Sequence, residues 1–294
     1  MTTVGVVARV GLTEAGTALR ELVAWLTERK VLVLLEDATA PLLDGECPGC
    51  ERASGSELAR RSDALVVLGG DGTLLRASRM LGVRSPPVLG VNFGSLGFLT
   101  EIALRELYPT LERVLAGGYE YDERQLLHAE VQRGGETVAE ADVLNDVVIT
   151  RAAQSRIVEL EVSIDGRFVS SFRADGLIVS TTTGSTAYNL AAGGPILQPS
   201  LPAVVLTPIC PHTLTHRPLV VSDQVRVEVR VCDTRDVDVH LTFDGQSGQP
   251  LTAEETVTIT RSARRLRLVH SASRDYFEVL RTKLRWGDST ARRR

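Results

Sequence analysis

Gly69-Gly70-Asp71-Gly72-Thr73 stands between an apolar run and a segment with helical spacing. The apolar run before it, Ala64-Leu65-Val66-Val67-Leu68, has the length and character of a strand buried on both faces. The segment after it, residues 74–81, predicts a helix, and Thr73 is a suitable residue to cap the start of that helix. The glycines therefore lie on a strand-to-helix turn, where open α/β sheets usually bind their ligands.

The composition of this turn indicates a phosphate-containing ligand. Three glycines let the backbone approach a phosphate closely, and free N–H groups at a helix start attract anions. Asp71 is a carboxylate within this anion-binding bed, so it must serve something else, most simply a hydroxyl group or a Mg²⁺ ion. The turn has neither the lysine of a Walker P-loop nor a G-x-G-x-x-G pattern, so neither common nucleotide fingerprint applies.

The residues around the turn predict an α/β domain from 1 to 121. An apolar repeat of Leu19, Leu22, Val23 and Leu26 predicts an early helix. Short apolar runs predict further buried strands at 3–10, 31–35 and 87–91. This alternation is typical of a Rossmann-like, doubly wound parallel sheet. The loop 92–99 would then leave the same sheet edge as the glycine turn.

The pattern changes after a helix predicted near 104–116. Residues 158–164 and 225–231 alternate apolar and polar side chains, and Asp165-Gly166 predicts a two-residue hairpin turn. We expect a mostly antiparallel all-β domain from 122 to 271. At the end of the chain, 272–294, we expect a helix that packs back on the first domain. Its apolar face would contain Tyr276, Phe277, Leu280 and Leu284.

Composition narrows the class of protein. The chain has 294 residues, 43% of them hydrophobic, which is typical of a soluble globular protein with two domains. Its net charge of −4 gives no electrostatic reason to expect nucleic acid or an anionic membrane as a partner. No apolar run approaches the ~20 residues that span a bilayer, and we see no signal-peptide pattern. We therefore expect a cytoplasmic protein.

The four cysteines do not predict a metal site. Cys47 and Cys50 form a C-x-x-C that could be half a zinc site or a redox pair, but we interpret them as two free thiols in a variable loop. Cys210 lies near His212 and His216 in a stretch that lacks the acids or the second cysteine pair of a metal centre.

Three stretches interrupt the alternation of the β half. They are Leu144–Ile149 with its Asn145-Asp146 pair, Asp175–Leu190 with a hydroxyl-rich Thr181–Thr186, and the turn Phe243–Gln246. Hydroxyls and free N–H groups in the second stretch could hold phosphate or ribose oxygens. Each stretch alone also fits a purely structural role, as a bulge, a capped loop or a turn.

Together with the glycine turn, these stretches resemble the NAD kinases from about residue 60 to 285. The resemblance rests on GGDGT at 69–73, VNFGSLGFL at 91–99, Asn145-Asp146, TGSTAY at 183–188 and PICPH at 208–212. GGDGT alone also occurs in lipid kinases and phosphofructokinases, but the combination is specific. The resemblance implies transfer of the γ-phosphate of ATP to the 2′-hydroxyl of the adenosine ribose of NAD.

The resemblance also implies roles for individual residues. Asp71 would accept the proton of the 2′-hydroxyl, although a role as metal ligand stays open. Asn145 and Asp146 would hold the nicotinamide ribose or amide, and Tyr188 would offer a stacking face to the adenine. The full set of implied contacts to the dinucleotide is Gly70, Asp71, Gly72, Arg76, Phe93, Asn145, Asp146, Arg156, Arg173, Asp175, Thr186, Ala187, Tyr188, Asn189, Leu190, Ala191 and Gln246.

Two positions depart from the family pattern. Asp146 is more often glutamate, and Thr182 is usually proline, which loosens the turn but removes no hydrogen-bond donor. The family further implies Mg²⁺ or another divalent cation with ATP, and a homo-oligomer, either dimer or tetramer. Two alternatives are a lipid or diacylglycerol kinase that shares GGDGT and a non-catalytic dinucleotide sensor on the same fold. Asn145-Asp146 and GSTAY at 184–188 are not expected in a lipid kinase, so they disfavour the first alternative. Asp71 disfavours the sensor, because binding alone does not need a carboxylate among phosphates.

Overall fold

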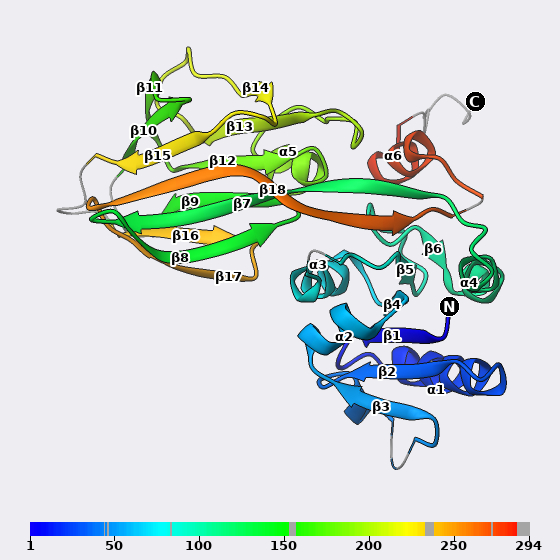
Figure 1. Cartoon of the computed structure of the whole chain (residues 1–294). Coiled ribbons are helices and arrows are strands. Elements are labelled where there is room, and N and C mark those ends of the chain that lie inside the picture. Colours follow the sequence, from blue (N-terminus) through cyan, green and yellow to red (C-terminus); the bar gives the residue numbers. More distant parts are fainter. Residues whose placement is uncertain are drawn as a thin grey trace, which may run out of the picture. The chain divides into compact units, whose positions relative to one another are not determined.

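The computed structural model describes residues 1–43, 45, 47–82, 84–152, 157–232, 238–271 and 273–286. The chain divides into two compact units (Figure 1). Unit 1 consists of Met1–Glu123 and Leu266–Arg294, and unit 2 of Arg124–Arg265. Within the described ranges, we find no helix with the length and apolar character needed to cross a membrane.

A parallel sheet forms the centre of unit 1. Its strands are β1 (Thr3–Ala8), β2 (Leu32–Glu36), β3 (Cys50–Ala53), β4 (Ala64–Leu68), β5 (Val88–Asn92) and β6 (Ile102–Ala103). They lie in the order β5-β4-β1-β2-β3, with β6 and the end of β18 (Glu255–Val269) also paired to β5. The chain order reverses between β1 and β4. This is the switch point at which doubly wound sheets bind ligands, and the glycine turn follows β4 directly.

Helices cover both faces of this sheet. Side chains of α1 (Thr13–Glu28) and α4 (Leu107–Leu115) share one buried core with Val4 and Val6 of β1. Gly5 points to the opposite face, where a Cβ would lie 2.8 Å from Leu58 of α2 (Gly55–Arg61). A Cβ at Gly90 would likewise lie 2.8 Å from Leu74 of α3 (Asp71–Met80). The predicted doubly wound α/β fold is confirmed.

The end of the chain returns to unit 1, as predicted. The Arg274 guanidinium donates to the Glu101 carbonyl at 2.8 Å, and the Lys283 ammonium lies 5.6 Å from the Phe98 ring centre. The helix α6 (Tyr276–Leu284) buries Val279 and Leu280, whereas Phe277 is 54% exposed. The helix itself is therefore confirmed, and Leu280, Tyr276 and Leu284 of its predicted apolar face are buried or half-buried. Only Phe277 was wrongly assigned to that face, and Val279 is buried instead.

An ion-paired histidine joins the end of β18 to the rest of unit 1. His270 Nε2 lies 2.8 Å from Asp122 Oδ1, and its Nδ1 lies 3.7 Å from Glu101 Oε2. Hydrogen bonds to Asp122 and Glu101 raise the pKa of His270 to about 9, and burial opposes the shift. The imidazole is therefore protonated at neutral pH.

We expect this histidine to make the stability of the protein fall with rising pH. Because the pKa of His270 is raised on folding, its contribution is fully present below pH 6.5 and is lost as the pH passes about 9. The loss should be on the order of 1 kcal/mol, since solvent screens a half-buried pair. Urea unfolding of wild type and His270→Gln at pH 6.5 and 9.5 measures it. The exposed His240→Gln is the control, and equal pH dependence in all three proteins would contradict the expectation.

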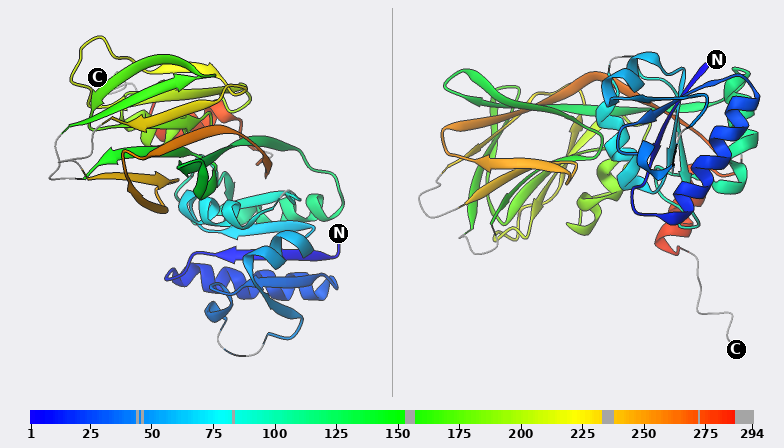
Figure 2. Two further views of the ribbon diagram at one scale, coloured as in Figure 1. Left: turned by 60° about the vertical axis from the view of Figure 1, so that its left-hand side comes forward. Right: turned by 90° about the horizontal axis from the view of Figure 1, so that it is seen from below.

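Unit 2 is a sandwich of two antiparallel sheets (Figure 2). One sheet has the order β14-β13-β12-β9-β16-β17. The other contains β11-β10-β15-β18, with β7 paired to β18 and to β8. Side chains from both sheets, among them Ile149, Leu177, Leu160 and Val257, form one buried core. The predicted antiparallel β fold of this half is confirmed.

The elements of unit 2 have the following bounds: β7 Tyr121–Arg133, β8 Glu136–Val143, β9 Asp146–Arg151, β10 Val158–Ile164, β11 Arg167–Ala174, β12 Gly176–Thr181, β13 Ala203–Ile209, β14 Leu219–Ser222, β15 Val227–Val231, β16 Val239–Phe243, β17 Ser247–Leu251 and α5 Tyr188–Ala191. Short 3₁₀ turns lie at Gly184–Thr186 in unit 2 and at Ala40–Leu42 and Leu104–Glu106 in unit 1. Asp165 and Gly166 join β10 to β11 with φ of 50° and 72°, which confirms the predicted hairpin turn.

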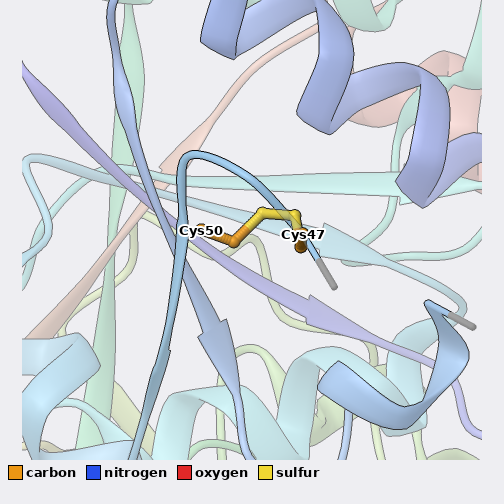
Figure 3. The surroundings of a disulfide bond; sticks show 2 residues. All are labelled: Cys47 and Cys50. Carbon is orange, nitrogen blue, oxygen red and sulfur yellow. A yellow bond between two sulfur atoms is a disulfide. The ribbon is translucent and has the colours of Figure 1, made fainter. Parts of the chain in front are cut away.

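Cys47 and Cys50 form a disulfide at the start of β3 (Figure 3). Our interpretation of these residues as free thiols in a variable loop is therefore wrong. Pro48 and Gly49, with φ of 88° at the glycine, turn the chain so that the Cys50 amide donates to the Cys47 carbonyl at 3.1 Å. This turn brings the two Cα atoms to 5.4 Å, within the usual range for a disulfide.

Candidate active site

The glycine turn places Asp71 in the first turn of α3. The helix begins at Asp71 with Gly70 as its N-cap, three residues before the predicted cap at Thr73. Thr73 instead lies inside the helix, where its amide donates to the Gly70 carbonyl at 2.9 Å and its hydroxyl packs over Gly69. A carboxylate in the first turn interacts favourably with the helix dipole. The difference matters because it makes Asp71 part of a rigid element rather than of a loop.

The loop between β5 and β6 fixes the orientation of the Asp71 carboxylate. Oδ2 accepts the Phe98 amide at 2.9 Å. Oδ1 accepts the Leu99 amide at 3.0 Å and both the amide and the hydroxyl of Thr100 at 3.1 Å. A carboxylate oxygen has about two lone-pair sites. Oδ1 is therefore saturated by the protein, whereas Oδ2 keeps acceptor capacity for a ligand proton or a cation.

Two further residues shape this loop, and neither was singled out from the sequence. A Cβ at Gly97 would lie 2.0 Å from Asp71 Oδ1 and 2.3 Å from the Thr100 hydroxyl, so only glycine fits. The Asn92 side chain donates to the Thr100 carbonyl at 2.8 Å and accepts the Gly94 amide at 3.1 Å. The neighbouring Phe93, a predicted NAD contact, is half-buried against the unit 1 core.

Arg76, a predicted contact to the dinucleotide, is engaged by other groups of the protein. Its guanidinium forms an ion pair with the buried carboxylate of Glu36 and donates to the Ala8 carbonyl at 2.9 Å. Ala8 and Glu36 end β1 and β2, so Arg76 lies along the carboxyl edge of the sheet. About a third of its side chain is exposed, and a guanidinium has five donors. It can therefore contact a ligand only with the donors that Glu36 and Ala8 leave.

In unit 2, Asn145 and Asp146 lie at one end of β9, where the turn between β16 and β17 contacts them. The Asp244 carboxylate accepts the amides of Leu144, Asn145 and Asp146 at 3.0, 2.7 and 3.1 Å. Asp146 is 4% exposed. Burial, and secondly the charge of Asp244, raises the pKa of the Asp146 carboxyl to about 7. Gln246, a predicted contact to the dinucleotide, is exposed in the same turn.

The hydroxyl-rich stretch packs directly against Asn145. The Thr181 hydroxyl donates to the Leu144 carbonyl at 2.6 Å and accepts the Gly184 amide at 3.0 Å. A Cβ at Gly184 would lie 2.2 Å from the Asn145 carbonyl oxygen, so a larger residue does not fit at this position. The Thr183 hydroxyl is buried and has no hydrogen-bond partner within the described part of the chain.

The predicted dinucleotide contacts at 186–191 follow this turn. Tyr188 is 44% exposed at the start of α5, and Ala191 is also exposed. Thr186, Ala187 and Leu190 are half-buried. Asn189 differs from the prediction, because its side chain is fully buried and donates to the carbonyls of Ser185 and Pro195 while it accepts the Thr207 hydroxyl. The side chain of Asn189 therefore holds the segment together instead of facing a ligand.

Asp175 lies at the other end of β9 and β12, and Arg173 precedes it at the end of β11. Asp175 precedes β12 and accepts the Arg151 guanidinium at 2.7 Å, and Arg173 is exposed on β11. Arg151 ends β9, so it lies five residue steps, about 17 Å, from Asp146 along the strand. Within unit 2 the structure thus brings Asn145, Asp146, 186–191 and Gln246 together but not Arg173 or Asp175. The predicted contact Arg156 lies outside the described residues.

A group of metal-type ligands is found elsewhere in unit 2. His128, Glu130 and Glu140 of the β7–β8 hairpin have ligand atoms within 4.8 Å of one another. His128 Nδ1 also lies 3.1 Å from Asp142, whose other oxygen binds Arg264 at 2.8 Å. These residues form an ion-pair network that includes none of the predicted nucleotide contacts.

Two protein-family models match this chain. The ATP-NAD kinase N-terminal domain matches residues 4–119, and the ATP-NAD kinase C-terminal domain matches residues 144–271. Among curated proteins, the NAD kinase of Citrifermentans bemidjiense is 49% identical over 288 residues, 98% of this chain and 100% of the relative. The NAD kinase of Geobacter sp. strain M21 is 48% identical over the same shares.

Solved structures give the same result. A yeast NADH kinase complexed with NADH superposes with a TM-score of 0.90 at 26% identity, covering 98% of this chain and 89% of that one. An NAD kinase from Archaeoglobus fulgidus in complex with ATP superposes with a TM-score of 0.75 at 25% identity, covering 97% and 99%.

Proposed function

Because this chain belongs to the ATP-NAD kinase family, we propose that it transfers the γ-phosphate of ATP to the 2′-hydroxyl of the adenosine ribose of NAD, giving NADP and ADP. The observation that carries the mechanism is Asp71, which lies on the first turn of α3 with one oxygen saturated and the other open. Oδ2 accepts the proton of the 2′-hydroxyl while the ribose oxygen bonds to the γ-phosphorus of ATP and the bond from that phosphorus to the bridging oxygen breaks, so that ADP leaves. A positioned carboxylate suits this step because a ribose hydroxyl is a weak nucleophile.

A divalent cation, Mg²⁺ in the first place, is proposed to accompany ATP and to neutralise the charge of its phosphates. The donor set fits a cation that arrives on the nucleotide, because Mg²⁺ commonly uses one or two carboxylates together with substrate phosphates. Oδ2 is the oxygen of Asp71 with room for such a contact. The roles of base and of metal ligand would therefore both use Asp71 Oδ2, and we favour the role of base.

The dinucleotide is proposed to bind through unit 2 residues. Asn145 and Asp146 hold the nicotinamide ribose or its amide, and 186–191 lines the adenine. The buried Thr183 hydroxyl, which lacks a protein partner within the described ranges, supports a polar ligand at this end of the sheet. Gly70, Gly72 and the remaining donors of Arg76 are proposed to contact the nucleotide from unit 1.

Tyr188→Ala should weaken NAD binding more than it slows the chemistry. The ring is 44% exposed and can stack on a base, an interaction worth ~1–3 kcal/mol in stacked nucleobase sites. We expect the KM for NAD to rise about tenfold, with the KM for ATP nearly unchanged, in initial-rate assays. Tyr188→Phe keeps the stacking face and is the control. If the KM for NAD of the alanine variant stays at the wild-type value, Tyr188 is not in the pocket.

A coupled assay for NADP tests the function itself. NAD, ATP and Mg²⁺ are supplied, and NADP is read with an NADP-specific dehydrogenase. Reactions without metal, without ATP, and with a diacylglycerol or a sphingoid base as acceptor are run in parallel. NADP that appears only with ATP and metal is the expected result. Phosphorylated lipid would favour the lipid-kinase alternative, and NAD binding without turnover would favour the sensor.

The protein is further proposed to act in the cytoplasm. It is also proposed to form a homo-oligomer. The support for an oligomer is apolar surface on the edge strands of unit 2, where Phe168 is 65% exposed on β11 and Val220 44% on β14. Light scattering at micromolar concentration measures the copy number. A mass of 31.9 kDa at every concentration would contradict the oligomer.

A further inference from the structure

One carboxylate organises the backbone on which Asn145 and Asp146 stand. Asp244 is 7% exposed, and its two oxygens accept three consecutive amides, those of Leu144, Asn145 and Asp146, at 2.7–3.1 Å. The Asp244 amide in turn donates to the Asp146 carbonyl at 2.9 Å. Charge-assisted hydrogen bonds of this kind are about twice as strong as neutral ones. The turn at 244 therefore fixes the peptide groups at the start of β9.

The same carboxylate also acts on the Asp146 side chain. Both groups are more than nine-tenths buried, and they belong to neighbouring elements, Asp146 to β9 and Asp244 to the β16–β17 turn. Two buried carboxyl groups at such a site cannot both ionise freely. Asp244 receives three N–H donors and is the better stabilised anion, whereas burial and the Asp244 charge raise the pKa of Asp146 to about 7.

We propose that Asp244 is a positioning residue of the dinucleotide site, whose carboxylate fixes the peptide groups of Leu144–Asp146 and whose charge acts on the Asp146 side chain. This inference rests on the proposed function, in which Asn145 and Asp146 contact NAD. Asp244 does not need to touch the ligand. It acts through the two residues that do.

Asp244→Asn tests the proposal, with Asp165→Asn as a matched control. Asp244 has a φ of 53°, in a region that asparagine tolerates, so the substitution leaves the turn accessible. Asp165 occupies an equivalent Asp-Gly turn with a φ of 50°, exchanges two hydrogen bonds with Arg226 at 2.9 Å, and contacts none of the site residues named above. We expect NAD to bind Asp244→Asn at least tenfold more weakly in calorimetry, with the KM for ATP within twofold of wild type. Asp165→Asn should match wild type in both.

The pH dependence of NAD binding separates positioning from a merely structural effect. Wild type should show a transition near pH 7, where Asp146 titrates. Removing the neighbouring charge at 244 should move this transition to lower pH, and Asp146→Asn should abolish it. A purely structural effect would weaken binding equally at every pH.

Three results would overturn the proposal: NAD affinity of Asp244→Asn within twofold of wild type, an equal loss in Asp165→Asn, or a transition that stays in place. If Asp244→Asn does not fold by circular dichroism, the comparison of wild type with Asp146→Asn decides. Identical pH profiles for those two proteins would then overturn the coupling. Wild-type protein that binds no NAD would fail in every arm and would instead refute the proposed function.

Discussion

Asp71→Asn should lower kcat by ~10²–10⁴, the range for a positioned acid–base group, while both KM values stay within a fewfold of wild type. The amide of asparagine cannot accept a proton at neutral pH. The substitution therefore preserves the shape of the side chain but removes the base. The substitution also lowers stability. In either orientation of the asparagine amide, its NH₂ group faces at least one backbone N–H donor, and in the better orientation this is the Phe98 amide alone. We therefore expect a stability loss of about 1–3 kcal/mol for one unsatisfied donor.

Asp63→Asn is the control for replacing an aspartate of unit 1 that accepts backbone amides. Asp63 Oδ2 accepts the amides of Thr2 and Thr3 at 2.8 and 3.2 Å, and the carbonyl oxygen of an asparagine can take over both bonds. The substitution should therefore cost less stability than Asp71→Asn and leave kcat unchanged. A kcat of Asp71→Asn within threefold of wild type would show that Asp71 is not the base. A loss of activity that excess Mn²⁺ or Mg²⁺ restores would assign Asp71 to the metal instead.

Gly97→Ala should lower kcat by at least ~10² although it changes no group that touches substrate. The added Cβ would lie 2.0 Å from Asp71 Oδ1 and 2.3 Å from the Thr100 hydroxyl, far inside contact distance. Because Asp71 is held by the backbone of 98–100, the methyl group must push the carboxylate or the loop aside. A displacement of about 1 Å at a catalytic group is enough for a hundredfold loss. Initial rates and a crystal structure of the variant would measure both effects.

Gly82→Ala controls for the substitution itself. Gly82 also lies in unit 1, has open space around its Cα and needs no left-handed backbone. Its replacement should leave kcat unchanged. If Gly97→Ala retains wild-type kcat with Asp71 in place, the loop accommodates a methyl group and does not set the carboxylate position. If Gly97→Ala loses only stability, its role is packing.

Much of the fold could be predicted because its elements have strong local signals. The apolar run before Gly69 predicts β4, and the alternation from 158 to 164 predicts β10. Several elements went unpredicted, and α2 and β3 show two of the reasons. The α2 helix carries a capping box, Ser54 with Glu57, which is visible in the sequence but sits in a helix only seven residues long. The β3 strand has four residues and depends on pairing with β2, which no local pattern reveals.

The site was less predictable because its geometry depends on backbone donors. A motif identifies Asp71, but not the three amides of 98–100 that orient it. The same holds for Asp244, which in the sequence is only one residue of a turn. For Asn189 the error runs the other way. Its position next to a binding motif predicts a ligand contact, but its side chain is buried and accepts the Thr207 hydroxyl. The separation of Asp175 from Asn145 follows from the register of β9 and β12, which the motifs do not contain.

The most direct test of the central claim is phosphorus NMR of NAD and MgATP incubated with the protein, followed over time for wild type and Asp71→Asn. The account predicts a new phosphomonoester resonance at the position of the 2′-phosphate of NADP, growing as the γ-phosphate of ATP disappears. It should form at least ~10²-fold more slowly with Asp71→Asn. A phosphate on another hydroxyl, or equal rates for the two proteins, would contradict it.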